Sequence, residues 1–252
     1  MPKNKESSHL RILKIIETIA AADQPLSPSD IAYDLDIPKP TVHRLIAQLK
    51  SERYVQTNPR GNIVSDVNLN KIAFGIIRGS RYKAIRESIL NGLSQEIDET
   101  CGISVADGVE MVYYDQVFTN FPIRINLPTG SRVPIYATAS GKLYLSQLTK
   151  AKRQKILSHL PMAQLAKNTH YQVEDFEAEF KAIRKQGYAI DNEEFIDGLI
   201  AIAVPIRDSD GTMTSSLFIH SLTVRKSLED LKKHLPLLQE TAQQLSDIYE
   251  QH

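Results

Sequence analysis

The sequence predicts an α+β protein in which a winged helix-turn-helix comes first and an antiparallel sheet with packed helices follows. Three observations support this fold class. Two short amphipathic helical patterns meet at a tight turn within residues 26–51, and a hairpin pattern follows over residues 53–64. Beyond residue 100, short strand patterns around Asp-Gly turns alternate with helical patterns. We therefore divide the chain into residues 1–79 and 80–252.

Bulk composition excludes several classes of protein. The chain has 252 residues, of which 42% are hydrophobic and 24% charged, which is typical of a globular protein. No apolar run approaches the roughly 20 residues of a membrane span, and the N-terminus lacks the apolar segment of a secretory signal. The single cysteine, Cys101, cannot form an intrachain disulfide or a thiolate metal cluster. We expect a cytoplasmic protein.

Net charge by itself does not indicate a nucleic-acid partner. The formal net charge is zero, and residues 1–60 contain nine Lys and Arg against seven Asp and Glu. Affinity for phosphate would then depend on where the basic side chains lie and on two copies of the chain acting together.

The first three predicted helices form one unit. Apolar residues recur between positions 10 and 19 and predict a helix that packs behind the next two, with apolar surface left over for a second subunit. Ser27 is the expected N-cap of the second helix, and Asp36 interrupts its apolar pattern. The third helix opens at Lys39, with Pro40 where a missing N–H costs nothing.

One face of this third helix carries the groove-reading side chains of a helix-turn-helix. Val42, Leu45, Ile46 and Leu49 are predicted to face the preceding helix. The residues left outward are Thr41, His43, Arg44 and Gln48. An ordinary helical hairpin in a core is the alternative interpretation. We place the DNA-contacting residues at Ser27, Lys39, Pro40, Thr41, His43, Arg44 and Gln48.

A hairpin directly after a recognition helix is a wing. Residues 53–56 and 62–64 flank a turn at residues 58–61. Arg60 and Asn62 lie near the tip, where they would contact phosphates or the minor groove. The alternative for Arg60 is a solvated turn residue.

The second part of the chain begins with a linker. Helices are predicted over residues 68–78, interrupted near Gly75 and Gly79, and over about 81–98, with Ile85, Ile89, Leu93 and Ile97 inward. Strands are predicted at 103–106, 111–114 and 122–127, from 188, and at 199–206 and 212–221. Further helices are predicted at 138–148, 150–160 and 174–186, and from a cap at Ser227 to about Tyr249 with a kink at Pro236.

Catalytic constellations are missing from the sequence. It contains no HExxH, GxSxG or SxxK motif and no glycine-rich dinucleotide fingerprint. Ser140-Gly141-Lys142 resembles the end of a P-loop, but Tyr136 and Leu143 stand where that motif needs glycine and Ser or Thr. The histidines at 159, 170, 220 and 234 lack metal-ligand spacing, and Cys101 is expected to be a small buried residue. We expect no cofactor, no metal and no enzymatic activity.

Small and polar residues from separate elements indicate a ligand pocket instead. Ala139 and Ser140 stand at a helix N-terminus, where free N–H groups favour an anion. Asp191 ends a strand, and Phe218 and His220 share one face of another. A satisfied core histidine is the alternative for His220, and a solvated turn is the expectation for residues 191–194.

Four stretches resemble the IclR family of bacterial transcription regulators, and the resemblance runs from about Leu10 to Leu245. They are PLSPSDIAYDLDIPKPTVHRLIAQL, LPTGSRVPIYATASGKLYL, IRKQGYAIDNEEFIDGLIAIAVPI and the strand LFIHS. The resemblance implies a winged helix-turn-helix joined by a linker helix to a GAF-like effector-binding domain. It also implies dimers, often paired into tetramers, that bind a palindromic operator and respond to a metabolite.

By position, the family's effector pocket maps to Ile125, Leu127, Ala139, Ser140, Asp191, Ala201, Phe218 and His220. Relatives often have Cys at the position of Ala201 and Ser at those of Phe218 and His220, so an aromatic acid or phenol fits better than a small ketoacid. Asp36 replaces the usual turn glycine, which Asp can do in the left-handed region.

Two other interpretations remain open at this stage. One is a small-molecule enzyme with an accessory winged domain, against which the missing nucleophile–base pair argues. The other is a winged module that binds protein, which salt-sensitive binding to a palindromic duplex would contradict.

Overall fold

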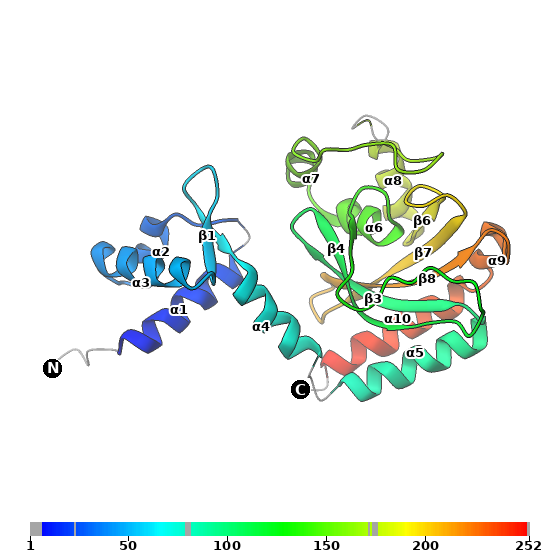
Figure 1. Ribbon diagram of the computed structural model, residues 1–252, viewed down its shortest axis with the longest axis horizontal. Coiled ribbons are helices and arrows are strands. Elements are labelled where there is room, and N and C mark those ends of the chain that lie inside the picture. The colour runs from blue at the N-terminus through cyan, green and yellow to red at the C-terminus, as the bar shows by residue number, and fades with distance from the viewer. Residues whose placement is uncertain (1–6, 23, 79–81, 171, 173–175, 251–252) are drawn as a thin grey trace. The chain divides into compact units, whose positions relative to one another are not determined.

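The computed structural model describes residues 7–22, 24–78, 82–170, 172 and 176–250. The chain forms two compact units, residues 1–79 and 80–252. Figure 1 labels their helices and strands. None of the described helices combines the length and apolar character that crossing a bilayer requires.

The N-terminal unit is three helices with a two-stranded wing. Its elements are α1 (Ser8–Ala21), α2 (Pro28–Asp34), α3 (Lys39–Ser51), β1 (Val55–Thr57), β2 (Ile63–Ser65) and α4 (Val67–Arg78). Ser27 caps α2 as predicted, in a reciprocal capping box with Asp30. Asp36 adopts φ of 50° in the turn before α3, which confirms that Asp takes the left-handed conformation there.

The apolar positions predicted from helical spacing form the core of this unit. Side chains from α1, α2, α3 and the wing meet in one cluster, with Ile15, Ile31, Val42 and Leu45 fully buried. The wing adds Val55 and Ile63, and an isolated bridge joins Ile63 to Leu26 ahead of α2. The wing is therefore anchored to the helical core through Val55 and Ile63.

A six-stranded antiparallel sheet, ordered β5-β4-β3-β8-β7-β6, organises the C-terminal unit. The strands are β3 (Thr100–Asp107), β4 (Glu110–Val117), β5 (Arg132–Pro134), β6 (Ala189–Asn192), β7 (Leu199–Arg207) and β8 (Met213–Leu222). The helices are α5 (Lys83–Ile97), α6 (Ala139–Gln147), α7 (Lys150–Leu157), α8 (Phe176–Gln186), α9 (Leu228–Lys232) and α10 (Leu235–Glu250).

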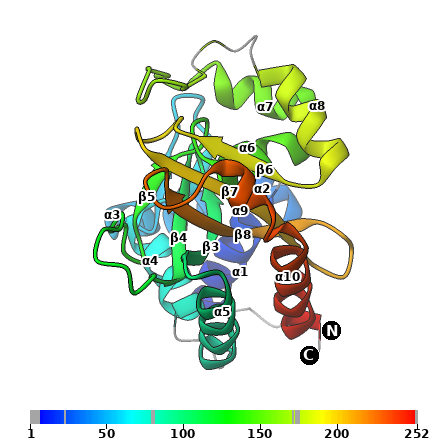
Figure 2. The same ribbon diagram turned by 90° about the vertical axis from the view of Figure 1, so that its right-hand side faces the viewer.

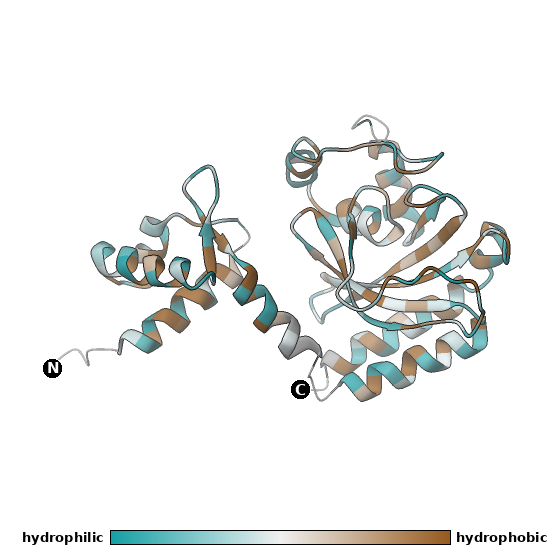
Figure 3. Ribbon diagram, in the orientation of Figure 1, coloured by the Kyte–Doolittle hydropathy of each residue, from teal (hydrophilic) through white to brown (hydrophobic). Residues whose placement is uncertain are grey.

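The sheet is covered on both faces. Figures 1 and 2 show α6 and α8 over one face and α5 and α10 under the other. Burial on both sides explains why β7 is apolar at nearly every position, as its brown colour in Figure 3 shows. The face under α6 carries Ala201 and Phe218, two of the residues predicted to contact a ligand.

Four predictions for this part of the chain were wrong. Residues 122–127 form no strand, and the third strand is Arg132–Pro134. Helix α4 runs through Gly75 without interruption, and the interruption predicted near Gly79 lies outside the described residues. Ile85 is exposed, and the neighbouring Arg86 is buried because it pairs with Asp115. The last helical segment is divided into α9 and α10, with Pro236 in the first turn of α10 rather than at a kink.

Candidate nucleic-acid interface and effector site

The exposed face of α3 carries the predicted DNA-contacting residues. Lys39, Pro40, His43, Arg44 and Gln48 are exposed, whereas Thr41 is half-buried. The residues at 42, 45, 46 and 49 are buried against α1 and α2, as predicted. No acidic residue lies in the first turn of α3, so the positive end of its helix dipole is not offset there.

Arg44 has a neighbour that the sequence did not indicate. Its Nη2 donates a hydrogen bond to Ser8 Oγ at 3.3 Å, which joins the outer face of α3 to the start of α1. Both groups are exposed, so the contact orients the guanidinium without burying it.

The wing tip is shaped by Asn58. Its Oδ1 accepts hydrogen bonds from the backbone N–H groups of Arg60, at 2.9 Å, and Asn62, at 3.0 Å. Gly61 takes φ of 81°, which favours glycine at this place in the turn. Arg60 is exposed and Asn62 half-buried. Ser27, also half-buried, accepts from Asp30 N through its hydroxyl and keeps its own O–H as a donor.

In the C-terminal unit, three of the predicted pocket residues lie in one row on a sheet face. Cα pairing aligns Asp191 with Ala201, Ala201 with His220, and His220 with Thr100 in a row across four strands. Because directly opposed residues of antiparallel strands point to the same face, these side chains are neighbours.

A second, adjacent row contains Phe218. It runs from Ala203 through Phe218 and Gly102 to Gln116. The ring of Phe218 lies against Gly102, where a Cβ would come within 2.7 Å of its Cζ. Gln116 was not predicted as a site residue, yet its amide Oε1 and Nε2 are buried without a hydrogen-bond partner in the described structure.

Phe218 fills much of this face. It stacks on Tyr113 with ring centroids 4.5 Å apart and on His220 at 5.9 Å. Leu127 and Ala139 pack in the same apolar cluster as Phe218 and Ala201, whereas Ile125 lines a recess beside His220. Ala139 and Ser140 begin α6 and are both buried. The structure thus brings the eight predicted residues to the α6 side of the sheet and its covering loop.

The expectation of a solvated turn at residues 191–194 was wrong. Asp191 and Glu194 are 1% and 4% exposed. Asp191 Oδ1 accepts from Glu194 N at 2.8 Å, but burial outweighs this hydrogen bond and raises the pKa of Asp191 to about 7. His220 is also buried, and desolvation lowers its pKa to about 4, so its ring is neutral at pH 7.

A buried lysine holds this turn in place. Lys142 on α6 is fully buried, and its Nζ lies 2.5 Å from Glu179 and from Glu194. Burial alone would lower the pKa of Lys142, but the two carboxylates reverse that effect and raise it. His170 joins the two glutamates in a group that could hold a metal ion, although the ammonium of Lys142 already offsets one of their two negative charges. In the sequence, the only indication of this buried site is Lys142 itself, a lysine among small and apolar residues in the first turn of α6.

Fold and sites together define a class of protein. A winged helix-turn-helix presents an exposed polar helix face, and a separate sheet domain presents partly unsatisfied polar groups over an apolar surface. This combination defines a two-domain transcriptional regulator that couples DNA binding to a small molecule.

Comparisons with known proteins agree. The family description "IclR helix-turn-helix domain" matches residues 8–59, and "Bacterial transcriptional regulator IclR C-terminal" matches residues 79–247. The probable transcriptional regulator SauR of Cupriavidus necator is 31% identical over 97% of this chain and 98% of that protein. The chain therefore belongs to the IclR family of bacterial transcriptional regulators. Members of this family are regulators, not enzymes.

Solved structures share the fold. A putative transcriptional regulator from Rhodococcus sp. RHA1 has a TM-score of 0.65 and 25% identity, covering 95% of this chain and 96% of that chain. A double mutant of the PobR inducer-binding domain from Acinetobacter, in complex with 3-hydroxybenzoic acid, has a TM-score of 0.62 and 28% identity. That match covers 65% of this chain and 96% of that chain.

Proposed function

We propose that a homodimer of this chain binds a palindromic operator and changes its affinity for that operator when a small organic acid binds the C-terminal domain, with an aromatic acid as the preferred candidate. The observation that carries this proposal is the exposed face of α3, where His43, Arg44 and Gln48 stand over a buried apolar face. Each α3 would enter a major groove, with the two helices about 34 Å apart in successive grooves. A dimer of dimers would extend the same arrangement.

Within α3, the residues divide by role. Arg44 and Gln48 would read base edges, since guanidinium and amide groups match purine edges in the major groove. Lys39, with Arg60 and Asn62 of the wing, would contact the phosphates and fix the register of the helix. Such a regulator acts on the chromosome and hence in the cytoplasm.

The chemistry of the sheet face supports an organic acid as effector. Phe218, Tyr113 and Leu127 offer an apolar, partly aromatic surface, and Asp191, His220 and Ser140 offer polar groups beside it. The related PobR domain was solved with 3-hydroxybenzoic acid, a ligand of this kind. Binding would favour one of two conformational states, and α4 and α5 would transmit the difference.

The test separates the two sites. An operator is first selected from random-sequence duplexes, and its affinity is measured for the wild type, Arg44→Ala and His220→Ala with and without each member of a panel of aromatic acids. Arg44→Ala should weaken operator binding at unchanged thermal stability and effector affinity. His220→Ala should change the response to effector while leaving ligand-free operator binding unchanged. Unaltered operator affinity in Arg44→Ala would contradict the role given to α3.

A further inference from the structure

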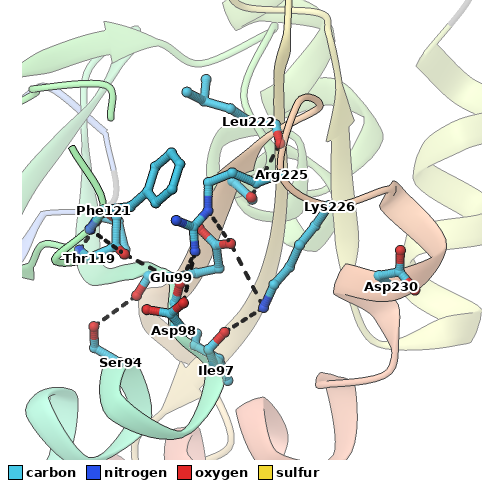
Figure 4. Close-up of polar contacts among 12 residues, drawn as sticks. Ser94, Ile97, Asp98, Glu99, Thr119, Phe121, Leu222, Arg225, Lys226 and Asp230 are labelled. Atoms are coloured by element: carbon cyan, nitrogen blue, oxygen red, sulfur yellow. Dashed lines mark hydrogen bonds and ion pairs between the residues drawn. The ribbon is translucent and has the colours of Figure 1, made fainter. Parts of the chain in front are cut away.

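A recess lies at one end of the two central strands of the sheet, where β3 begins and β8 ends. The side chains that line this recess include Thr100, Thr119, Arg124, Ile125, His220 and Arg225. Figure 4 shows the polar network on one side of the recess, around Glu99 and Arg225. Only His220 and Ile125 of this set were predicted to contact the effector.

His220 is the first sign that a ligand belongs here. The residue is 4% exposed, and its Nε2 is buried without a hydrogen-bond partner in the described structure. An unpaired buried polar nitrogen is costly, so native proteins normally satisfy such a group with a partner, a water molecule or a ligand. Since His220 lines the recess, a ligand bound there is the candidate partner for this nitrogen.

The charge of the recess is the second sign. Arg225 is already neutralised, with its Nε 3.0 Å from Glu99 and its Nη2 3.1 Å from Asp98, as Figure 4 shows. Lys226 donates to the carbonyl oxygen of Ile97 and lies 3.8 Å from Glu99. The three cations Arg124, Arg225 and Lys226 thus face two carboxylates, which leaves one positive charge.

That remaining charge belongs to Arg124. Its Nη1 donates to the carbonyl oxygen of Thr119 at 3.0 Å, and its guanidinium lies 5.0 Å from the ring centre of Phe118. In the ranges that the structure describes, no carboxylate pairs with it. A guanidinium has five N–H donors in a planar fork that matches a carboxylate.

The start of α6, the other expected anion site, is less accessible. Thr138 Oγ1 accepts from Gly141 N at 3.3 Å, and Lys142 N donates to the carbonyl of Thr138. The backbone of Ile135 lies so close that a Cβ on Gly141 would be 2.0 Å from its carbonyl oxygen. Two of the first N–H groups of α6 are therefore already used within the helix terminus, and the backbone of Ile135 closes the side at Gly141.

We infer that the recess binds the carboxylate of the effector, with Arg124 as its ion-pair partner and His220 as a hydrogen-bond partner. Thr100 offers a further hydroxyl on the row of His220, and Ile125 offers apolar contact to the body of the ligand. This inference rests on the proposed function and deepens it, because it says which group of the effector binds and which residue selects for charge.

The experiment compares charged and neutral ligands of the same shape on the full chain. Benzoate is titrated against benzamide, and acetate against acetamide, by calorimetry and NMR with the wild type, Arg124→Gln and Arg132→Gln. Arg132 is the matched control, an exposed arginine on β5 that pairs with Asp107 and Glu110. We expect saturable binding of at least one carboxylate, with its amide about tenfold weaker or more. Arg124→Gln should remove that preference and Arg132→Gln should keep it.

A second readout places the ligand. The ring resonance of His220, identified by its absence in His220→Gln, should shift on titration with the carboxylate. Binding of neither carboxylate, equal affinity for acid and amide, unchanged affinity in Arg124→Gln, or an unmoved His220 resonance would each overturn the inference. If carboxylate binds as expected but operator affinity does not change, the inference stands and the proposed regulation fails.

Discussion

The buried pair Arg86–Asp115 gives a prediction whose size follows from its burial. Arg86 on α5 and Asp115 on β4 are 1% and 4% exposed, with Nε and Oδ2 2.5 Å apart. Replacing Arg86 with Met would leave a buried carboxylate without its cation, which costs about 3–5 kcal/mol. Because 1 kcal/mol shifts the Tm of a domain of 150–250 residues by about 2–4 °C, the C-terminal unit should melt about 6–20 °C lower.

Thermal unfolding of the full chain measures this effect. The chain has ten tyrosines and no tryptophan, so calorimetry and tyrosine fluorescence are suitable probes. The control is Arg132→Met, which breaks the two surface pairs with Asp107 and Glu110 and should cost about 1 kcal/mol or less. The double variant Arg86→Met/Asp115→Leu should recover much of the loss, since it removes both charges. If Arg86→Met is no more destabilising than Arg132→Met, the reasoning about buried charge is refuted.

Two further predictions concern the sheet face and α5. The raised pKa of Asp191, about 7, means that stability present below pH 4 is lost as pH rises toward 7. The lowered pKa of His220, about 4, means that stability present above pH 6.5 is lost as pH falls toward 4. Urea unfolding from pH 4 to 6.5 measures both effects. Relative to the wild type, the free energy of unfolding of Asp191→Asn should rise by about 1 kcal/mol per pH unit as the pH increases, and that of His220→Gln should fall by about the same amount. Profiles parallel to that of the wild type would contradict both assignments. Gly102→Ala should destabilise by about 1–3 kcal/mol because its Cβ would meet Phe218 and the Asp115 carbonyl, whereas Gly92→Ala, which meets open space in α5, should stabilise by about 0.4–1 kcal/mol. Equal unfolding midpoints for these two variants would show that the close approach at Gly102 is not real.

Local patterns in the sequence were sufficient for the N-terminal unit. Helical spacing predicted that Val42, Leu45 and Leu49 would be buried and that Arg44 would be outward, because a helix places every third or fourth residue on one face. The cap at Ser27 and the left-handed turn at Asp36 also depend only on near neighbours.

The C-terminal unit was less predictable where a residue's environment depends on a distant segment. A strand was predicted at residues 122–127, but β4 pairs with residues 132–134 instead. Spacing predicted an inward Ile85, yet Arg86 is the buried residue because Asp115 on β4 supplies its counter-charge. Strand pairing and the choice of counter-ion depend on contacts between elements that are distant in the sequence, and the periodicity of one segment does not predict those contacts.

The sequence by itself determined the helix-turn-helix, the wing and the sheet class, since these follow from period, capping and turn chemistry. Only the tertiary structure decided which charged side chains are buried and which have a counter-charge beside them. Lys142 meets Glu194 from 52 positions away and Arg225 meets Glu99 from 126, while Arg124 meets no carboxylate among the described residues. The free-energy cost of removing a charge from water depends on the groups that pack around it, and folding brings these groups together from distant parts of the sequence.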